Sequence, residues 1–279
     1  MDARSLLRIV AHRPFPLPAG PWVMTQTWHD LLFVHWRVRP ELLRPCLPDE
    51  LTIDTFDGDA WLSVGPFWLW GIRLRWTRPI PFASGFPVLH GRTYGRYGNR
   101  PGVYFLSLDA PHRLLSTIAR YWFHLRYVSS RTRVQRSREW IEFTSRRRDG
   151  RGEGGMFEAL YRPCGAARDA NDNDLTRWLV ERYRLYAGDR SGGLWQADIH
   201  HRPWMIQPAE AQIKINTMPL AHGLPSCGSP AIVHFAKHME VLVWAPRRVE
   251  LSSSNAVDHF RCGSGKSRYR ADRKSVTIE

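Results

Sequence analysis

Short β-rich runs separated by turn residues recur along the chain, and this pattern constrains its fold more than any other feature of the sequence. The clearest example is the pair Asp57-Gly58, which separates the β-rich runs 51–56 and 59–64. An Asp-Gly pair in such a setting is the strongest short-range signal for a β-hairpin, because its two-residue turn needs positive φ angles. Alternation and β-rich composition predict further strands at 24–38, 88–97, 103–108, 121–128, 132–136, 139–144, 156–162, 194–201, 209–215 and 232–243.

Helical signals are few. Pro40 can open a short helix over 40–46, since proline is tolerated in a first helical turn. Short helices are also predicted at 5–10 and 111–120, and the longest at 172–186, where apolar residues follow a 3.6-residue period after several N-cap candidates. Strands and helices do not alternate regularly, which argues against a doubly wound parallel sheet. The pattern predicts an α+β fold that is mainly antiparallel β, with a few peripheral helices.

Composition divides the chain into three parts. Prolines cluster between residues 14 and 21 and favour extended chain, so 1–21 is interpreted as a lead-in rather than core. Residues 22–250 hold all the predicted strands and are interpreted as one domain, as a length of 279 residues and a hydrophobic share of 43% allow. Beyond that point the apolar periodicity stops, and 251–279 is predicted to be a disordered basic tail.

The formal net charge of +14 suggests nucleic-acid binding, but the distribution of the charge does not support it. Arginine dominates, the first lysine is Lys214, and such a composition more often reflects the base composition of a genome than a binding surface. The densest basic stretches, 126–151 and 261–274, carry no nucleic-acid reader motif. The segment 263–267 imitates a phosphate loop, but Phe260 stands where that motif needs glycine. Nucleic-acid binding through an arginine-rich surface therefore stays a second alternative.

Neither a metal site nor a cofactor is predicted. The four cysteines, at positions 46, 164, 227 and 262, are far apart, which indicates free thiols in a reducing compartment. His200 and His201 are adjacent on a strand and face opposite ways, and the pair His234 and His238 lacks a clear third ligand. No apolar run reaches the ~20 residues of a membrane span, and the one near the N-terminus is too short for a signal peptide. We therefore expect a cytoplasmic protein without a membrane partner.

Several stretches of the chain resemble a bacterial family of unknown function typified by YqjF. These stretches are RPELLRPCLPDEL (39–51), DGDAWLS (57–63), RTY (92–94), RPGVYFLSLDA (100–110), PW (203–204), QPAE (207–210), HFAK (234–237) and VLVWAPRRV (241–249). They span about residues 22–250. The resemblance implies the β-barrel fold of acetoacetate decarboxylase, a fold that carries a small-molecule site.

The resemblance also implies a chemical difference. Acetoacetate decarboxylase forms a Schiff base through a lysine whose amine is nucleophilic near neutral pH. That lysine follows the strand that corresponds to 103–110, where this chain has His112 and Arg113 and no lysine before Lys214. Arginine cannot replace it, because its pKa keeps it protonated. The chain is therefore not expected to be a lysine Schiff-base decarboxylase, and whether it is an enzyme at all stays open.

A second departure concerns the strand that carries the RTY motif. Relatives in the family read Glu-Leu-Asn-Val-Arg-Thr-Tyr, whereas this chain reads VLHGRTY over 88–94. The acidic position is apolar, and His90 stands in place of the asparagine. If the glutamate served the chemistry of the family, this member has lost it or has changed its substrate.

The candidate catalytic residues are His90, Arg92 and Tyr94. A period of two places them on one face of their strand, which would line a barrel cavity. There Arg92 would hold a carboxylate through two parallel hydrogen bonds, and Tyr94 or His90 would move a proton. The alternative is that this face contacts solvent and the intervening glycines pack beneath a helix.

Seven further residues are predicted to contact a ligand: Ser107, Asp109, His112, Trp61, Trp68, Glu142 and Glu210. Alternation places Ser107 and Asp109 on the same face as Phe105. Each has an alternative role: Asp109 as a helix cap, the glutamates as solvated or ion-paired groups, and the tryptophans as core. The predicted function is binding of a small organic acid or carbonyl compound, with or without turnover. A non-catalytic binding module is the first alternative, and a homo-oligomer is left open.

Overall fold

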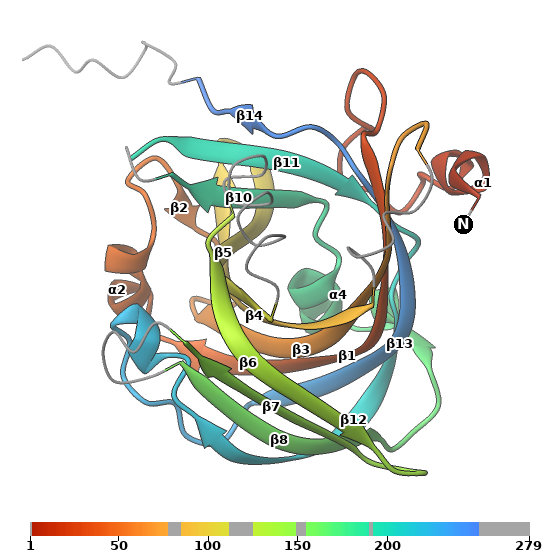
Figure 1. Ribbon diagram of the computed structural model, residues 1–279. Helices are drawn as coiled ribbons and strands as arrows, with labels where there is room; N and C mark the ends of the chain where they lie inside the picture. The colour runs from red at the N-terminus through yellow and green to blue at the C-terminus, as the bar shows by residue number, and fades with distance from the viewer. Residues whose placement is uncertain (1, 78–84, 112–124, 149–154, 190–191, 251–279) are drawn as a thin grey trace, which may run out of the picture. The chain divides into compact units, whose positions relative to one another are not determined.

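The computed structural model describes residues 2–77, 85–111, 125–148, 155–189 and 192–250. Contacts divide the chain into a unit 1–249, which holds every described helix and strand, and a unit 250–279, of which only residue 250 is described. The strands are β1 Met24–Val38, β2 Thr52–Ile53, β3 Ala60–Leu74, β4 Phe86–Tyr97, β5 Arg100–Ala110, β6 Tyr127–Arg136, β7 Ile141–Arg147, β8 Met156–Pro163, β9 Arg168–Asp169, β10 Arg184–Gly188, β11 Leu194–His200, β12 Met205–Asn216, β13 Ile232–Val243 and β14 Arg247–Arg248 (Figure 1). The helices are α1 Ala3–Arg8, α2 Pro40–Leu43 and α4 Asp174–Val180, with 3-10 turns η1 Arg44–Cys46, η2 Ala170–Asp172 and η3 Leu220–His222.

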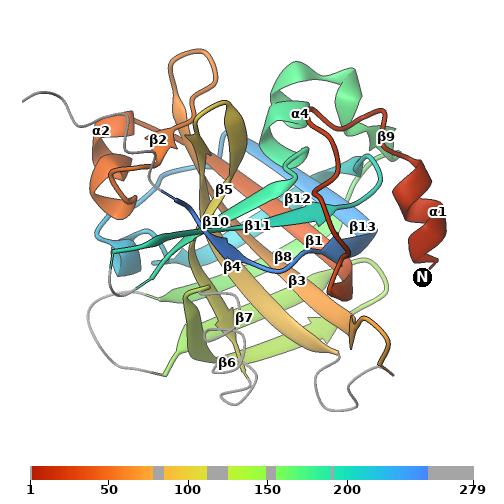
Figure 2. The ribbon, with the colours of Figure 1, turned by 90° about the horizontal axis from the view of Figure 1, so that it is seen from above.

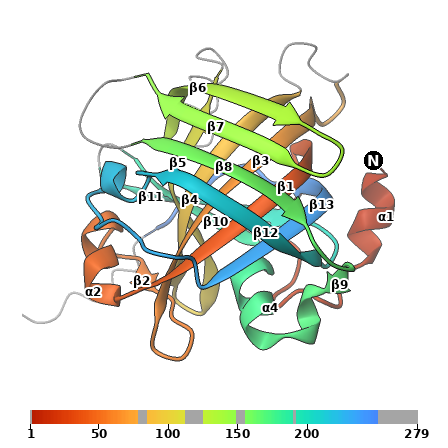
Figure 3. The same cartoon turned by 90° about the horizontal axis from the view of Figure 1, so that it is seen from below.

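The strands of the first unit form two closed rings that share a wall. The shared wall runs β13-β1-β3-β4-β5. The small ring is closed by β10 and β11, which pairs back to β13, and the large ring by β6, β7, β8 and β12. Figure 1 looks into the small ring, and Figure 3 shows the four closing strands of the large ring side by side. Most pairs are antiparallel, with β5–β6 and β5–β10 parallel, so the mainly antiparallel α+β fold class is confirmed.

The shared wall is apolar on both faces because each face closes a different ring. Along β1, Leu31 and Phe33 pack in the cluster that contains residues of α4, while Leu32 and Val34 pack with Phe143 and Phe157 of the large ring. A strand buried on both sides needs apolar residues at consecutive positions, which explains the run Leu-Leu-Phe-Val at 31–34. The sequence predictions 24–38 and 232–243 coincide with β1 and β13.

Helix α4 lies at one end of the small ring (Figures 1 and 2). The side chain of Asn173 accepts a hydrogen bond from Thr176 N and caps the helix, and Leu179 is buried in the small-ring cluster. The sequence predicted a helix over 172–186, and its second half is wrong. Residues 184–188 instead form β10, because backbone pairing with β5 and β11 outweighs the local helical pattern.

The Asp57-Gly58 turn is present, but the predicted hairpin around it is not. Both residues have positive φ, +52° and +84°, and Phe56 bridges Asp59. Beyond that single bridge the arms separate, since β2 pairs with β4 and β3 pairs with β1 and β4. The turn therefore connects two strands of the wall region rather than closing a hairpin.

The described part of the lead-in, residues 2–21, packs against other parts of the first unit. Helix α1 overlaps the helix predicted at 5–10, and it buries Leu6, which is 1% exposed, against Leu242 and Trp244. The expectation that this segment lies outside the core is therefore wrong for Leu6. The predicted helix 111–120 lies, apart from Pro111, outside the described residues, as does the tail 251–279. Among the described helices, none combines the length and apolarity that a bilayer crossing requires.

Candidate functional site

The side chains of His90, Arg92 and Tyr94 alternate along β4 and lie inside the small ring. They are 3%, 8% and 0% exposed. Tyr94 belongs to the apolar cluster that includes Leu179 of α4, and the ring of His90 lies 6.0 Å from that of Phe67. The structure thus brings the three candidate catalytic residues together, and their roles stay predictions.

Arg92 is a buried cation that none of the described carboxylates neutralises. Its Nη2 donates to the backbone carbonyl of Leu179 at 3.2 Å, and its guanidinium carbon lies 5.0 Å from the ring centroid of Phe33. Its Nε is buried and has no hydrogen-bond partner among the described residues, and none of these residues forms an ion pair with it. The neighbouring Arg182 is already neutralised, because its Nη1 lies 2.6 Å from Asp54 Oδ2.

His90 is held as a neutral imidazole. Burial lowers its pKa well below the usual value, and the positive charge of Arg92 lowers it further. Its Nε2 has no hydrogen-bond partner among the described residues. Gly65 pairs with it on β3, and a Cβ at Gly65 would lie 2.5 Å from His90 Cε1. The imidazole therefore occupies space that exists because residue 65 has no side chain.

Two histidines that sequence reasoning did not assign to the site complete it. The hydroxyl of Tyr94 lies 3.4 Å from Nδ1 of His35 on β1, and the ring of His35 lies 5.7 Å from that of His234 on β13. Burial lowers the pKa of His35 well below its usual value, with contributions from His234, Arg92 and His90. The signal that could have found His35 is its place two residues after Phe33, on the face of β1 that meets the small ring.

Aromatic side chains surround these polar groups, but only one of the two predicted tryptophans is among them. Trp61 is 1% exposed and packs in the small-ring cluster with Trp178 and Trp204. Trp68 faces the other side of β3, where the guanidinium carbon of Arg136 lies 5.9 Å from its ring. The structure therefore does not place Trp68 beside Arg92.

Ser107 and Asp109 lie on the opposite face of the shared wall, toward the large ring. Arg147 of β7 donates from Nε and Nη2 to the two carboxylate oxygens of Asp109, at 2.7 and 3.1 Å, and from Nη2 to Ser107 Oγ at 2.6 Å. Nε2 of His222 lies 3.2 Å from the same Oγ. Burial, with the charges of Arg147 and Arg126, lowers the pKa of His222 to about 3. These hydrogen bonds join the four side chains to one another and not to Arg92, so they form a polar group separate from the three candidate catalytic residues.

A bulge in β5 separates these residues from Phe105, which alternation had placed on their face. Gly91 pairs with Ser107, whereas the next residue, Arg92, pairs with Phe105. The extra residue in β5 shifts the alternation, so Phe105 contacts His90 while Ser107 faces away. The predicted common face of Phe105, Ser107 and Asp109 is therefore wrong.

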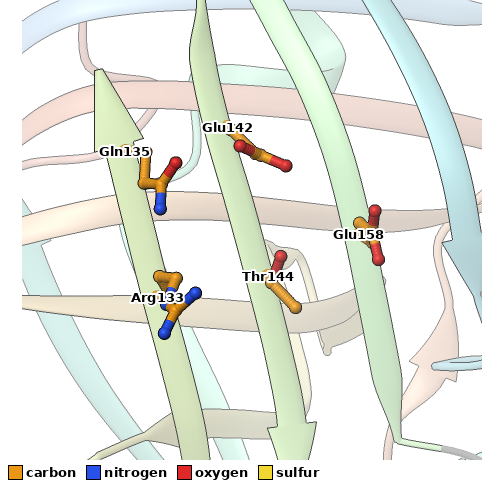
Figure 4. Close-up of a pocket in the computed structure, with 5 residues that line it drawn as sticks. All are labelled: Arg133, Gln135, Glu142, Thr144 and Glu158. Atoms are coloured by element: carbon orange, nitrogen blue, oxygen red, sulfur yellow. The ribbon is translucent and has the colours of Figure 1, made fainter.

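The remaining predicted residues lie elsewhere. Glu142 lines a hollow of about 380 Å³ on the outer face of the large ring, together with Arg133, Gln135, Thr144 and Glu158 (Figure 4). Glu210 forms an exposed ion pair at 2.9 Å with Arg162. His112 lies outside the described residues.

The two described lysines lie away from the small ring. Lys214 and Lys237 have side chains that are 54% and 73% exposed, and they pair with Glu158 and Asp30. In the described ranges, no group of three or more His, Cys, Asp or Glu residues is arranged to hold a metal ion.

Comparison with known sequences identifies a family and a relative that resemble this chain. Residues 25–240 match the model of DUF2071, a family described as an uncharacterized conserved protein. Uncharacterized protein YqjF of Bacillus subtilis (strain 168) is 43% identical over 232 residues, which is 83% of this chain and 95% of that relative.

Two solved structures share the fold at low sequence identity. One is an acetoacetate decarboxylase-like enzyme from Sphingomonas wittichii RW1, with a TM-score of 0.56, 14% identity, and coverage of 85% of this chain and 98% of that one. The other is the enduracididine biosynthesis enzyme MppR complexed with pyruvate, with a TM-score of 0.54, 10% identity, and coverage of 82% and 91%. Both likenesses concern the fold.

Proposed function

The chain belongs to the DUF2071 family and has the fold of acetoacetate decarboxylase-like enzymes, and on this premise we propose that it binds a small organic acid or carbonyl compound inside the small ring. The ligand would lie among His90, Arg92 and Tyr94, enclosed by the aromatic side chains that surround them. Turnover without an imine is the further part of this proposal, and a binding protein without turnover would use the same residues.

The observation that carries the proposal is the buried charge of Arg92, which no ion pair with a described residue neutralises. A buried ion without a counter-ion costs several kcal/mol, so proteins rarely keep one without a use. Its Nε has no partner among the described residues, and a ligand carboxylate could accept from Nε and from a terminal nitrogen in parallel. The charge of Arg92 would then be neutralised by the ligand.

Two groups beside Arg92 could supply a proton to such a ligand. Tyr94 carries an O–H within the same cluster, and its hydroxyl oxygen lies 3.4 Å from Nδ1 of His35. His90 is neutral because of burial, so it can donate from one ring nitrogen and accept at the other. Proton transfer from either group to a carbonyl oxygen or a developing carbanion is ordinary general acid catalysis.

The solved structures suggest which probes to use. MppR was solved with pyruvate, and the Sphingomonas enzyme is described as acetoacetate decarboxylase-like. Pyruvate and acetoacetate are both small acids that carry a carbonyl group. They combine the two chemical features that Arg92 and a proton donor would recognise.

Thermal-shift and calorimetric titrations with pyruvate, acetoacetate and acetate test the proposal. Wild-type protein should bind at least one of these acids. A ligand at a concentration about 100 times its Kd raises the unfolding free energy by about 2.7 kcal/mol, which the thermal shift would report. Arg92→Gln should weaken the binding at least about tenfold, because a hydrogen bond to a charged group is worth about 1.5–3 kcal/mol. Arg133→Gln, on the exposed outer face of β6, is the control and should bind as wild type does.

Two results would contradict the proposal. No binding of any of the three acids at millimolar concentration would remove the organic-acid assignment. Binding that Arg92→Gln leaves intact, and that Arg133→Gln abolishes, would move the anion site to the hollow on the large ring.

A further inference from the structure

Four polar side chains from four elements of the fold lie in sequence between the centre of the small ring and its surface. Tyr94 of β4 contacts His35 of β1, with the hydroxyl 3.4 Å from Nδ1. The ring of His35 lies 5.7 Å from that of His234 of β13, at an interplanar angle of 68°. Nε2 of His234 lies 3.4 Å from the hydroxyl oxygen of Thr176 on α4.

Exposure increases along this series. Tyr94 and His35 are both 0% exposed, whereas His234 and Thr176 are partly exposed. The register of the shared wall produces the series, because Phe33 pairs directly with His234 and places His35 diagonally beside it on the same face. The series therefore leads from a fully buried hydroxyl to the surface near α4.

Each of the two histidines has one buried ring nitrogen to which no described residue forms a hydrogen bond. Nε2 of His35 and Nδ1 of His234 are buried and have no hydrogen-bond partner among the described residues. The other nitrogen of each ring makes the contact with Tyr94 or with Thr176. One water molecule between the two free nitrogens would satisfy both, as buried waters commonly do for otherwise unpaired groups.

We propose that His35 and His234 form a proton path that connects the hydroxyl of Tyr94 with solvent beside α4. A neutral imidazole can accept a proton at one nitrogen and release one from the other, which is what such a path requires. Burial lowers the pKa of His234 to about 4 and that of His35 well below its usual value, so both rings are neutral at neutral pH. Arg92 and His90 are the other titratable or charged groups that act on His35.

The proton balance of the path is closed. When Tyr94 gives its hydroxyl proton to a ligand, the phenolate oxygen takes a proton from Nδ1–H of His35. His35 then takes a proton at Nε2 from the bridging water, the water takes one from Nδ1–H of His234, and His234 takes one at Nε2 from solvent beside Thr176. One proton has moved from bulk water to the ligand, Tyr94 and the water have regained their protons, and each histidine now carries its proton on Nε2 instead of Nδ1. A second transfer follows once both rings have returned to the Nδ1–H tautomer by exchanging these protons with water. This deepens the proposed function, because it makes Tyr94 an acid that can be recharged while the ligand fills the small ring.

The exchange rate of tyrosine hydroxyl protons with solvent tests the path without any ligand. In protein labelled with ¹³C at tyrosine Cζ, the Cζ resonance shifts when deuterium replaces the hydroxyl proton. In mixed H₂O and D₂O, slow exchange gives two Cζ resonances and fast exchange gives one, so the spectrum reports the exchange rate for each tyrosine. Tyr161 is the internal reference, since it is 2% exposed and donates to a backbone carbonyl, that of Asp30, at 3.3 Å. Tyr94 should exchange on the order of 10²-fold faster than Tyr161, the gain typical of a positioned acid–base group.

Variants then locate the path. His234→Phe and His35→Phe should each slow the exchange at Tyr94 to the rate of Tyr161 and leave Tyr161 unchanged. His238→Phe is the matched control, because His238 is an exposed histidine four residues further along the same strand. It should leave both rates unchanged.

The outcomes separate this proposal from the proposed function. Exchange at Tyr94 as slow as at Tyr161 in the wild-type protein refutes the path, whether or not the variants fold. Unchanged exchange at Tyr94 in His234→Phe, with Tyr161 also unchanged, refutes it as well. Failure of pyruvate, acetoacetate and acetate to bind would instead remove the proposed function and leave this measurement interpretable.

Discussion

A single glycine determines where one ring of the candidate site can lie. Gly65 sits opposite His90 in the β3–β4 register, and a Cβ there would lie 2.3 Å from the carbonyl oxygen of Leu32 and 2.5 Å from His90 Cε1. The first of these contacts is with backbone, which cannot turn away. The imidazole and the wall can therefore approach closely only because residue 65 lacks a side chain.

Gly65→Ala should destabilise the protein and displace His90. Overpacking of this kind costs about 1–3 kcal/mol, which urea denaturation would measure. Gly91→Ala is the matched control one strand away, because its Cβ would meet His222 Nε2 at 3.5 Å and Ser107 Oγ at 3.7 Å, which are ordinary contacts. Equal costs for the two substitutions would contradict this account.

At the scale of single residues, alternation along one strand was the reliable part of the sequence analysis. It placed His90, Arg92 and Tyr94 on one face, and the structure has them there. It failed between Phe105 and Ser107, because a bulge is set by pairing with a partner strand and leaves no mark in the local period. It also missed His35, whose importance comes from a contact 59 residues away along the chain.

Between elements, the pair Asp109 and Arg147 links strands β5 and β7, which are not neighbours in the sheet. Asp109 is 0% exposed, and the side chain of Arg147 is 8% exposed. A buried pair of this kind contributes little more than well-packed apolar residues would, but breaking it leaves one charge buried alone. We infer that it positions β7 against the shared wall.

Asp109→Asn should cost about 3–5 kcal/mol in unfolding free energy, because it removes the counter-charge of Arg147. Glu210→Gln, which breaks the exposed pair with Arg162, should cost no more than about 1 kcal/mol. Urea denaturation of the two variants side by side measures both values. A cost for Asp109→Asn as small as that for Glu210→Gln would show that the buried pair does not fix the strands.

Element prediction succeeded where a strand is long and failed where a segment is short. β1 and β13 were predicted to the residue, because each carries a strong pattern over a dozen residues or more. Residues 184–186, which begin β10, were assigned to the end of the helix 172–186, since so short a segment cannot show whether a periodic pattern continues or ends. Its strand character comes from the pairing of β10 with β5 and β11, which local sequence does not encode.

At the scale of the whole molecule, burial favours the neutral form of several described histidines. Burial lowers the pKa of His200 and His234 to about 4, and that of His201 and His222 to about 3. In the unfolded chain these groups have a pKa near 6.5. Between these values the unfolded state binds more protons than the folded state, so stability rises with pH.

Unfolding free energy should therefore fall as pH is lowered from about 6.5 toward 4, by up to about 1.4 kcal/mol per pH unit for each of these histidines. Urea denaturation at pH 7.5, 6.5, 5.5 and 5.0 measures the slope. Repulsion within the net charge of +14 also opposes folding, but salt at 1 M screens repulsion between exposed charges. Salt does not change the burial of a histidine ring, so the slope that comes from burial should persist at 1 M salt. A stability that is flat between pH 6.5 and 5.0, or a slope abolished by 1 M salt, would contradict the prediction.

Ring closure also limits where the strands of this protein can pair with a strand of another chain. Where the structure describes the chain, each long strand has hydrogen-bonded neighbours on both sides over part of its length, and the open ends of the sheet fall at β2 and β14, two residues each. A strand from outside could extend the sheet only where this pairing is one-sided, as along residues 130–136 of β6, which pair with β7 but not with β5. Self-association of this first unit through backbone pairing would therefore be confined to such one-sided stretches, and elsewhere it would rely on side-chain complementarity.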